Sequence, residues 1–262
     1  MNSNHAALLG AYKDIAEILG KNGIRFYAAY GTAIGAIRHS GFIPWDDDLD
    51  IAVFADDLDE VNRVLSEGLD RDKYYYHAPS ADSHPHVVVK TDDMVEDIKS
   101  QNVSFIDIFL FLDYPESAIR RALMYPFIGF ELLSHKIIRD HGSKAVKEFF
   151  YAVMNVSRKM SRLISVPDTP RVCFRAVEIR ENSWERKDLG EPVPHRFEDT
   201  TIPLPCNADK MLREYYGDYM TPPPEDQRAG ATGFPYSLLE DYLEDQSDGP
   251  RHHRLCRADL PK

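Results

Sequence analysis

The sequence predicts an α+β fold, in which a front half that alternates helices with strands is followed by a mainly helical back half. Up to about residue 114, apolar residues at helical spacing alternate with short β-branched runs. From Glu116 to about Leu163 the pattern is helical throughout. We therefore expect a core at 1–114, a mainly helical region at 115–240 that packs on it and shares its cleft, and a polar tail at 241–262.

Turn residues separate the expected elements of the front half. Residues 4–23 have helical spacing and stop at Asn22-Gly23. Thr32 is expected to N-cap a short helix over 33–39, and 56–68 to form a helix with an acidic first turn. The expected strands are 24–30 (IRFYAAY), 49–54 (LDIAVF), 73–78 (KYYYHA), 84–91 (HPHVVVKT) and 103–112 (VSFIDIFLFL). The last strand is apolar on both faces, which predicts a central position in the sheet.

The back half contains one strongly apolar stretch at 122–138, ALMYPFIGFELLSHKII. We favour a core helix kinked at Pro126 for this stretch; the alternative is an acceptor-side helix that touches a membrane surface. A shorter helix is expected at 169–183, and another at 208–218 with Asn207 as its N-cap.

Composition excludes several classes of function. The 31 basic and 43 acidic residues give a net charge of −12, which argues against broad binding to nucleic acid or anionic membranes. Three widely spaced cysteines offer no zinc or disulfide framework. The start of the chain lacks the pattern of a signal peptide, and no apolar run approaches the roughly 20 residues that cross a bilayer. We therefore expect a cytoplasmic protein.

Four aspartates fall within five positions, at 46, 47, 48 and 50, where a strand begins. Because side chains alternate along a strand, Asp48 and Asp50 share one face, whereas Leu49, Ile51 and Val53 occupy the other. Two carboxylates side by side repel each other unless a cation lies between them. Their hard oxygen ligands suit Mg²⁺ or Mn²⁺ better than zinc.

A further aspartate, Asp107, lies within the apolar stretch FIDIF, where an unpaired charge would be costly. If its strand lies beside the LDIAV strand, Asp107 completes a three-carboxylate metal site with Asp48 and Asp50. The alternative is that residues 46–48 form a solvated turn and that Asp107 pairs with a buried Arg or Lys. The metal site is the preferred interpretation because a Gly31-Thr32 turn precedes the aspartates, and the amides that follow such a turn can receive a phosphate.

Three stretches carry a resemblance to a known family. They are YGTAIGAIRHSGFIPWDDDLDIAV (30–53), FIDIFLFLDYP (105–115), and FEDTTIPLP (197–205) running into LREYYGDYMTPPPEDQR (212–228). Together they resemble the LicD family, which belongs to the nucleotidyltransferase superfamily and is related to fukutin. The resemblance implies a nucleotidyltransferase-like core, a mixed β-sheet flanked by helices.

The resemblance also implies an activity and a set of site residues. LicD-like proteins typically transfer phosphocholine from CDP-choline, a CDP-alcohol donor, to a hydroxyl of a cell-surface glycan or its precursor. By motif position, Gly31 and Thr32 take the glycine-turn role in substrate binding. Asp48, Asp50 and Asp107 are the expected catalytic residues and ligands of Mg²⁺, with Mn²⁺ as an alternative.

Four other side chains are candidates for substrate binding. Arg38 follows the turn and Lys90 ends the run HVVVK, so each is a candidate contact for the donor diphosphate, or else a surface ion pair. Trp45 could hold a choline headgroup through its aromatic face. Glu198 could orient a ligand hydroxyl or cap a turn.

The histidines of the same region, His77, His84 and His86, lack an evident set of ligand partners in the sequence. We interpret them as structural or solvent-facing.

Two alternative functions remain open at the level of sequence. A nucleotidyltransferase that places a nucleotide monophosphate on a small molecule, sugar or protein would use the same turn and aspartates. A non-catalytic scaffold would have lost a carboxylate, yet all three candidates are present.

A lipid-linked glycan acceptor would bring peripheral membrane contact at the inner face of the membrane.

Overall fold

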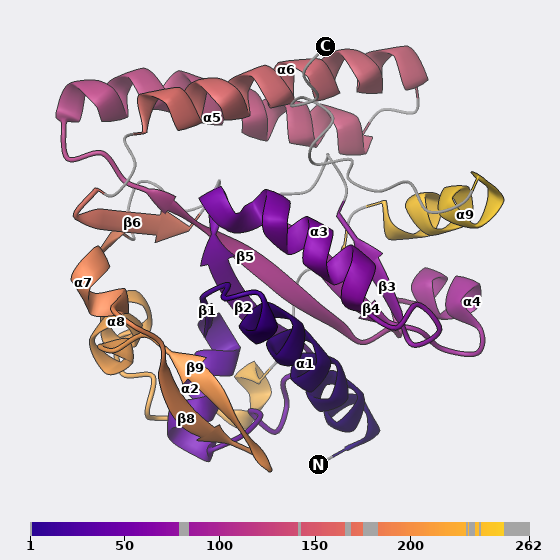
Figure 1. The fold of residues 1–262 in the computed structure, drawn as a ribbon, viewed down its shortest axis with the longest axis vertical. Helices are drawn as coiled ribbons and strands as arrows, with labels where there is room; N and C mark the ends of the chain where they lie inside the picture. The colour runs from indigo at the N-terminus through magenta and orange to yellow at the C-terminus, as the bar shows by residue number, and fades with distance from the viewer. Residues whose placement is uncertain are drawn as a thin grey trace.

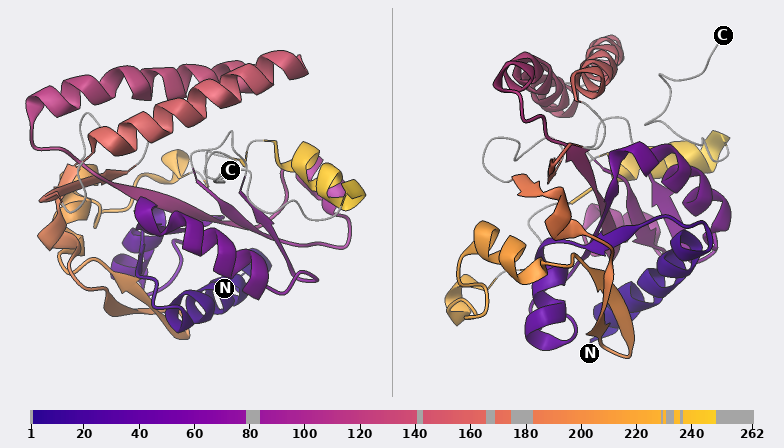
Figure 2. Two further views of the ribbon diagram at one scale, coloured as in Figure 1. Left: turned by 45° about the horizontal axis from the view of Figure 1, so that its top comes forward. Right: turned by 60° about the vertical axis from the view of Figure 1, so that its left-hand side comes forward.

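The computed structural model describes residues 2–78, 84–140, 143–165, 169–174, 183–228, 230, 234–235 and 237–248. A mixed sheet forms the centre of the molecule, and two long helices lie side by side as a separate layer beyond one end of it (Figure 1). The two further views show the same separation of the helical pair from the rest of the fold (Figure 2). The expected α+β class, with a mixed sheet flanked by helices, is confirmed.

The sheet has seven strands among the described residues. Its path is β1 (Phe26–Ala28), β2 (Leu49–Phe54), β5 (Phe105–Asp113), β4 (His86–Val89) and β3 (Tyr74–His77). Two further strands, β6 (Arg171–Phe174) and β7 (Ser183–Glu185), extend it from the second half of β5. Within the described ranges, β2 and β5 run parallel and the other pairs of this sheet are antiparallel. The predicted central position of β5 is therefore confirmed.

A second, two-stranded sheet consists of β8 (Val193–Phe197) and β9 (Thr200–Leu204). The helices are α1 (Ser3–Lys21), α2 (Tyr30–His39), α3 (Leu58–Gly68), α4 (Met94–Lys99), α5 (Ala118–Asp140), α6 (Lys144–Ile164), α7 (Arg186–Leu189), α8 (Ala208–Tyr216) and α9 (Leu238–Asp248). Short 3-10 turns cover Ala55–Asp57 and Glu225–Gln227.

The main core lies between the sheet and the pair α1 and α3, which cover one of its faces (Figure 1). Leu49, Ile51 and Val53 of β2 point into this core and are fully buried, as the alternation of the strand predicts. Each such buried aliphatic side chain contributes about 1.5–3 kcal/mol. Asp50 and Ala52 consequently project from the opposite face of the sheet, where the acidic residues lie.

The predicted helix at 169–183 is wrong. Residues 171–174 form β6, and 183–185 form β7, while 175–182 lie outside the described residues. Val172 and Phe174 are buried against Phe111 of β5 and Trp184 of β7. Pairing with the open second half of β5 overrides the weak helical spacing of this segment.

Three boundary predictions also change. The helix α2 begins at Tyr30, with Ala29 at its N-cap position, so Thr32 is not the cap. Asn207 does occupy the N-cap position of α8, but its side chain makes no capping hydrogen bond. Of the predicted polar tail, 241–248 belongs to α9 and 249–262 lies outside the described residues.

Candidate active site

The three predicted metal ligands come together on the face of the sheet opposite α1 and α3. Asp50 of β2 lies directly opposite Asp107 of β5 in the parallel ladder, and Asp48 precedes Asp50 by two residues. One carboxylate oxygen from each of the three lies within 4.8 Å of the others. The structure therefore brings together side chains that are 57 positions apart in the sequence.

The electrostatics of this cluster are unfavourable without a cation. Asp50 is only 6% exposed, and burial followed by the charges of Asp48 and Asp107 raises its pKa well above the usual range. Burial, with added repulsion from Asp46 and Asp107, raises the pKa of Asp48 to about 8. Burial and the charge of Asp47 raise the pKa of Asp46 to about 6. The cluster must hold protons or a cation at neutral pH, and an all-oxygen ligand set of this kind fits Mg²⁺ or Mn²⁺.

The start of α2 is fixed to the start of β2 by backbone contacts. The Asp50 amide donates to the Thr32 hydroxyl at 2.8 Å, and the Ala29 amide donates to the Asp50 carbonyl at 3.0 Å. The Gly31 amide donates to the Asp50 carboxylate and partly offsets the rise of its pKa. A Cβ at Gly31 would lie 2.6 Å from Oδ2 of Asp46, so glycine is what lets Asp46 approach the helix start.

The guanidinium groups of two arginines lie over the ring of Trp45. The guanidinium carbon of Arg228 lies 4.5 Å from the ring centroid, and that of Arg38 lies 5.8 Å from it. Desolvation and the charge of Arg228 lower the pKa of Arg38, while the carboxylate of Asp46 opposes this shift. The structure thus places Arg38 beside the acidic residues together with Arg228, which the sequence analysis did not select.

Glu198 and Lys90 lie in other surroundings. Glu198 has a left-handed backbone with φ 52°, its carboxylate accepts from the Phe42 amide at 3.1 Å, and its own amide donates to the Ser40 carbonyl. It thereby anchors the loop that leads to Asp46. Lys90 follows β4, four positions beyond His86, and its ammonium group donates to the Arg71 carbonyl at 2.7 Å. The structure does not bring Lys90 to the acidic cluster.

The structure gives His84 and His86 a shared partner, Asp107, that the sequence did not reveal. Nε2 of His84 lies 3.4 Å and Nε2 of His86 lies 3.3 Å from Oδ1 of Asp107, and His86 is only 3% exposed. In the described part of the chain, Asp107 therefore lies beside histidines and pairs with no Arg or Lys, unlike in the alternative interpretation. His77 is buried beside Asp241, with Nε2 3.1 Å from Oδ2, as a structural residue would be.

An aromatic cluster borders the acidic one on the same face of the sheet. Phe109, two residues after Asp107, contacts His84 with ring centroids 4.2 Å apart and Tyr30 at 4.7 Å. Tyr30 in turn stacks on Phe174 at 4.7 Å and meets Tyr215 edge-on. The period-two spacing of Asp107 and Phe109 was the signal that could have selected Phe109 from the sequence.

The fold and the acidic site define a nucleotidyltransferase-type domain, and comparison with known proteins agrees. Residues 23–136 match the family described as LicD/FKTN/FKRP, nucleotidyltransferase domain. These residues are thus similar to the LicD family, as the motifs predicted.

Individual relatives give further detail. The chain is 25% identical over 244 residues to the lipopolysaccharide cholinephosphotransferase LicD of Haemophilus influenzae, covering 81% of this chain and 86% of that protein. It is 44% identical over 55 residues to an uncharacterised protein of Rickettsia prowazekii, a fifth of either chain. The similarity to the Haemophilus protein supports a transferase.

Among solved structures, terminal uridylyl transferase 4 from Trypanosoma brucei with bound CTP shares 13% identity. The match covers 63% of this chain and 56% of that one, with a TM-score of 0.25, which is too low to support an argument.

Proposed function

We propose that this protein is a metal-dependent transferase that moves phosphocholine, or a related phospho-alcohol, from a CDP-linked donor to a hydroxyl of a cell-surface glycan or its precursor. The observation that carries this proposal is the convergence of Asp48, Asp50 and Asp107, within 4.8 Å of one another, inside a domain similar to the LicD family. The name of the Haemophilus relative, a lipopolysaccharide cholinephosphotransferase, favours phosphocholine and a glycan acceptor.

The reaction requires positioning and charge neutralisation more than covalent chemistry by the protein. The acceptor oxygen attacks the phosphorus that carries the choline, the bond from this phosphorus to CMP breaks, and CMP leaves with the electron pair. Asp48 and Asp50 would hold the cation, and Asp107 would receive the proton of the acceptor hydroxyl. Mg²⁺, when bound, supplies neutralisation of the diphosphate and lowers the pKa of the hydroxyl.

Positive side chains next to the cluster suit the diphosphate of the donor. Arg38 and Arg228 both face Trp45, and Arg38 is close enough to Asp46 for their charges to interact. We assign them to the donor phosphates in preference to Lys90, which lies near Arg71. Trp45 then orders the two guanidinium groups rather than binding choline itself.

The aromatic cluster beside Asp107 suits the headgroup. A quaternary ammonium ion has no N–H to donate and is bound best by aromatic faces. Phe109 and Tyr30 are half-buried and lie next to the carboxylates, so a choline held against them would leave its phosphate near Asp107. We assign this wall to the alcohol portion of the donor.

A thermal-shift screen tests the proposal. CDP-choline, CDP-ethanolamine, CDP-glycerol and CDP-ribitol are each added with and without Mg²⁺, and we expect stabilisation by one donor that requires the cation. If none of the four donors stabilises the protein, the proposal is contradicted.

Analysis of the released product then separates the two transfer reactions. Free CMP indicates transfer of the phospho-alcohol, whereas pyrophosphate released from a nucleoside triphosphate indicates the alternative, nucleotidyl transfer.

The helical pair α5 and α6 supports contact with a lipid-linked acceptor at a membrane surface. Among the described residues, nine of the thirteen exposed large apolar side chains lie on this pair: Ile119, Leu123, Tyr125, Phe130, Leu132, Leu133, Phe149, Val156 and Leu163. No helix in the described ranges is both long and apolar enough to cross a bilayer. The favoured prediction of a core helix therefore holds for one side of α5 only, where Met124, Ile128 and Ile138 are buried.

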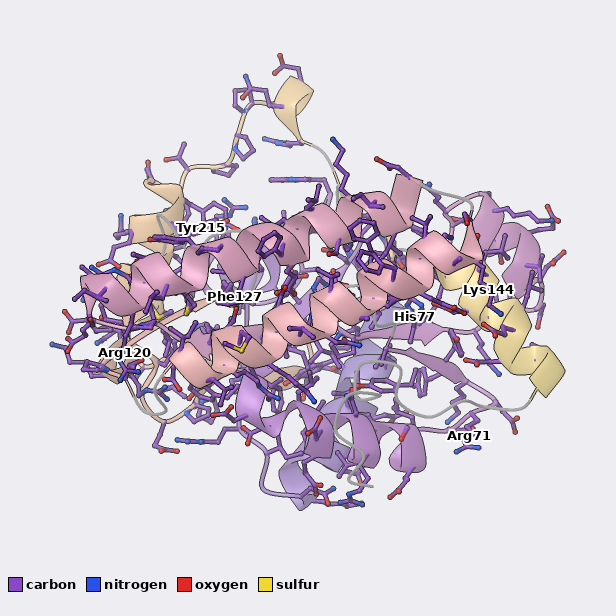
Figure 3. All side chains as sticks on the ribbon, turned by 90° about the horizontal axis from the view of Figure 1, so that it is seen from above. Arg71, His77, Arg120, Phe127, Lys144 and Tyr215 are labelled. Carbon is purple, nitrogen blue, oxygen red and sulfur yellow. The ribbon has the colours of Figure 1, made fainter. Side chains whose placement is uncertain are left out.

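The charge of this pair indicates which kind of membrane it would meet. Residues 118–164 contain nine Lys or Arg and three Asp or Glu, although the whole chain carries a net charge of −12. Seen from above, the basic residues Arg120 and Lys144 lie near the two ends of the helical layer (Figure 3). An apolar surface flanked by cations suits the headgroup region of an anionic bilayer, in which such helices lie parallel to the membrane plane.

A further inference from the structure

We propose that His84, His86 and Asp107 form a second metal site, with nitrogen and oxygen ligands, that shares Asp107 with the all-carboxylate cluster and takes Mn²⁺, Co²⁺ or Zn²⁺. This inference deepens the proposed function and rests on it, because the shared carboxylate is the one assigned to the acceptor hydroxyl. One ligand atom from each of the three residues lies within 4.8 Å of the others.

The local backbone places both imidazoles on the face of Asp107. His86 is the register partner of Asp107 in the antiparallel pair of β4 and β5. The ladder continues before β4, because the Ile108 amide donates to the Pro85 carbonyl at 3.0 Å. Residues 84 and 86 therefore follow the alternation of a strand, and both side chains point to the same side of the sheet.

The distances fit two ligands of one ion better than a hydrogen bond. A charge-assisted hydrogen bond between imidazole and carboxylate is about 2.7–2.9 Å long. Here the separations from Oδ1 of Asp107 are 3.4 Å to His84 and 3.3 Å to His86. Two ligand atoms at about 2.0–2.1 Å from one tetrahedral ion lie roughly 3.3–3.4 Å apart.

The burial of the Asp107 oxygen adds to these distances. Oδ1 of Asp107 is buried and, within the described part of the chain, has no hydrogen-bond partner. Burying a carboxylate oxygen without a hydrogen bond costs stability. Both imidazoles lie next to this same oxygen, Oδ1 of Asp107.

The ligand types separate this site from the neighbouring one. Imidazole suits transition metals such as Co²⁺ and Zn²⁺, and Mn²⁺ accepts it more readily than Mg²⁺ does, whereas three carboxylates suit Mg²⁺. Two imidazoles and one carboxylate also leave coordination positions open, as catalytic sites require. The chain therefore offers two adjacent sites of different chemistry, joined by Asp107.

Electron spin-echo measurements on the whole chain test this site with Mn²⁺ as the probe. The protein is freed of metal with a chelator, given excess Mg²⁺ to fill the carboxylate site, and then given one equivalent of Mn²⁺. We expect ¹⁴N coupling from histidine in the wild-type spectrum. An all-oxygen spectrum would overturn the inference and leave the imidazoles as groups that orient Asp107.

Two variants sharpen the test. His84→Gln and His86→Gln should each weaken Mn²⁺ binding by more than the roughly 10- to 100-fold that loss of an outer-shell partner costs, and reduce the ¹⁴N coupling. His195→Gln, on β8 and outside the cluster, is the matched control and should change neither. His86 is buried, so the more exposed His84 decides the outcome if His86→Gln fails to fold. Unchanged Mn²⁺ affinity in a folded His84→Gln would contradict the site.

The thermal-shift screen separates failure of this inference from failure of the proposed function. Absence of donor-dependent stabilisation with the ¹⁴N signal intact would count against the transferase alone. Stabilisation by a CDP donor with Mg²⁺ and no ¹⁴N signal would count against the histidine site alone.

Discussion

The acidic cluster and the α5–α6 pair depart from the usual distribution of side chains in opposite directions. At the cluster, charged groups are buried, with Asp50 only 6% exposed. On the helical pair, apolar groups are exposed, with Leu163 reaching 75%. Both arrangements cost the folded chain stability when no other component is present, because a buried charge lacks compensation and an exposed apolar surface orders water. The comparison supports the two proposals made above, that a cation completes the first region and a lipid surface the second.

The largest expected effect is at the cluster. Asp50→Asn should reduce turnover by about 10³-fold or more, because it removes a cation ligand where charge must be neutralised. The melting temperature of the metal-free protein should stay constant or rise, since repulsion from Asp48 and Asp107 is relieved. CMP release and calorimetry measure the two quantities. Asp92→Asn, an exposed carboxylate, is the control; a large fall in melting temperature with activity retained would show that Asp50 is structural.

The next effect concerns the helical pair. Leu132→Ser combined with Leu133→Ser should reduce binding to phosphatidylglycerol vesicles by roughly 10- to 100-fold, because two half-exposed leucines no longer enter the bilayer. Co-sedimentation measures this binding. Leu243→Ser on α9 is the matched control, with 48% exposure against 46% and 50% for the two leucines. If the wild-type protein fails to bind these vesicles and instead forms a dimer that the double variant dissolves, the surface is an interface between two copies of the chain.

A smaller effect tests the aromatic wall. Phe109→Leu should raise the KM for CDP-choline by about 5- to 10-fold, because it removes an aromatic face worth roughly 1 kcal/mol to a cation. The KM for a donor with an uncharged alcohol, such as CDP-glycerol, should change less. Equal changes for both donors would remove the assignment of Phe109 to the headgroup. Phe149→Leu, on the distant α6, is the control.

The smallest effect is a dependence of stability on pH. The pKa of Asp48 is about 8 in the folded state, above its ordinary value of 3.8. Asp48 therefore contributes fully to the stability of the folded protein below pH 3.8, and this contribution is lost as the pH rises through 8. Metal-free protein should therefore melt roughly 5 °C lower at pH 8.5 than at pH 6. Saturating Mg²⁺, or the Asp48→Asn substitution, should largely remove this difference. A difference that survives both changes would come from other groups.

Local patterns in the sequence predicted much of the fold and part of the candidate site. The alternation of β2 and the apolar context of Asp107 were sufficient to predict three converging carboxylates, because strand geometry fixes which side chains share a face. The helix α1 ended at Asn22 and Gly23 as predicted, since Gly23 adopts a positive φ of 67°. The division of the chain at residue 114 remains a proposal, although β6 and β7 join the sheet of the front half.

The features that were missed depend on contacts between distant segments. His84 and His86 meet Asp107 only through the register of β4 on β5, which no local pattern specifies. The segment 171–174 became a strand because β5 offered an unpaired edge. Glu198 and Arg228 reach the loop around Trp45 from about 150 positions or more along the chain, so their roles could not be derived from spacing.

The register of β2 on β5 fixes the separation of two carboxylates of the candidate site through the backbone. Adjacent strands lie about 4.8 Å apart, and this spacing, not a mobile loop, sets how far Asp50 stands from Asp107. The two carboxylates are consequently preorganised before any ion arrives, and little conformational entropy remains to be lost on binding. The same rigidity makes glutamate a poor substitute for Asp50. Asp50→Glu keeps the charge but moves the carboxylate outward by one methylene, about 1.5 Å, across a gap that the sheet cannot widen.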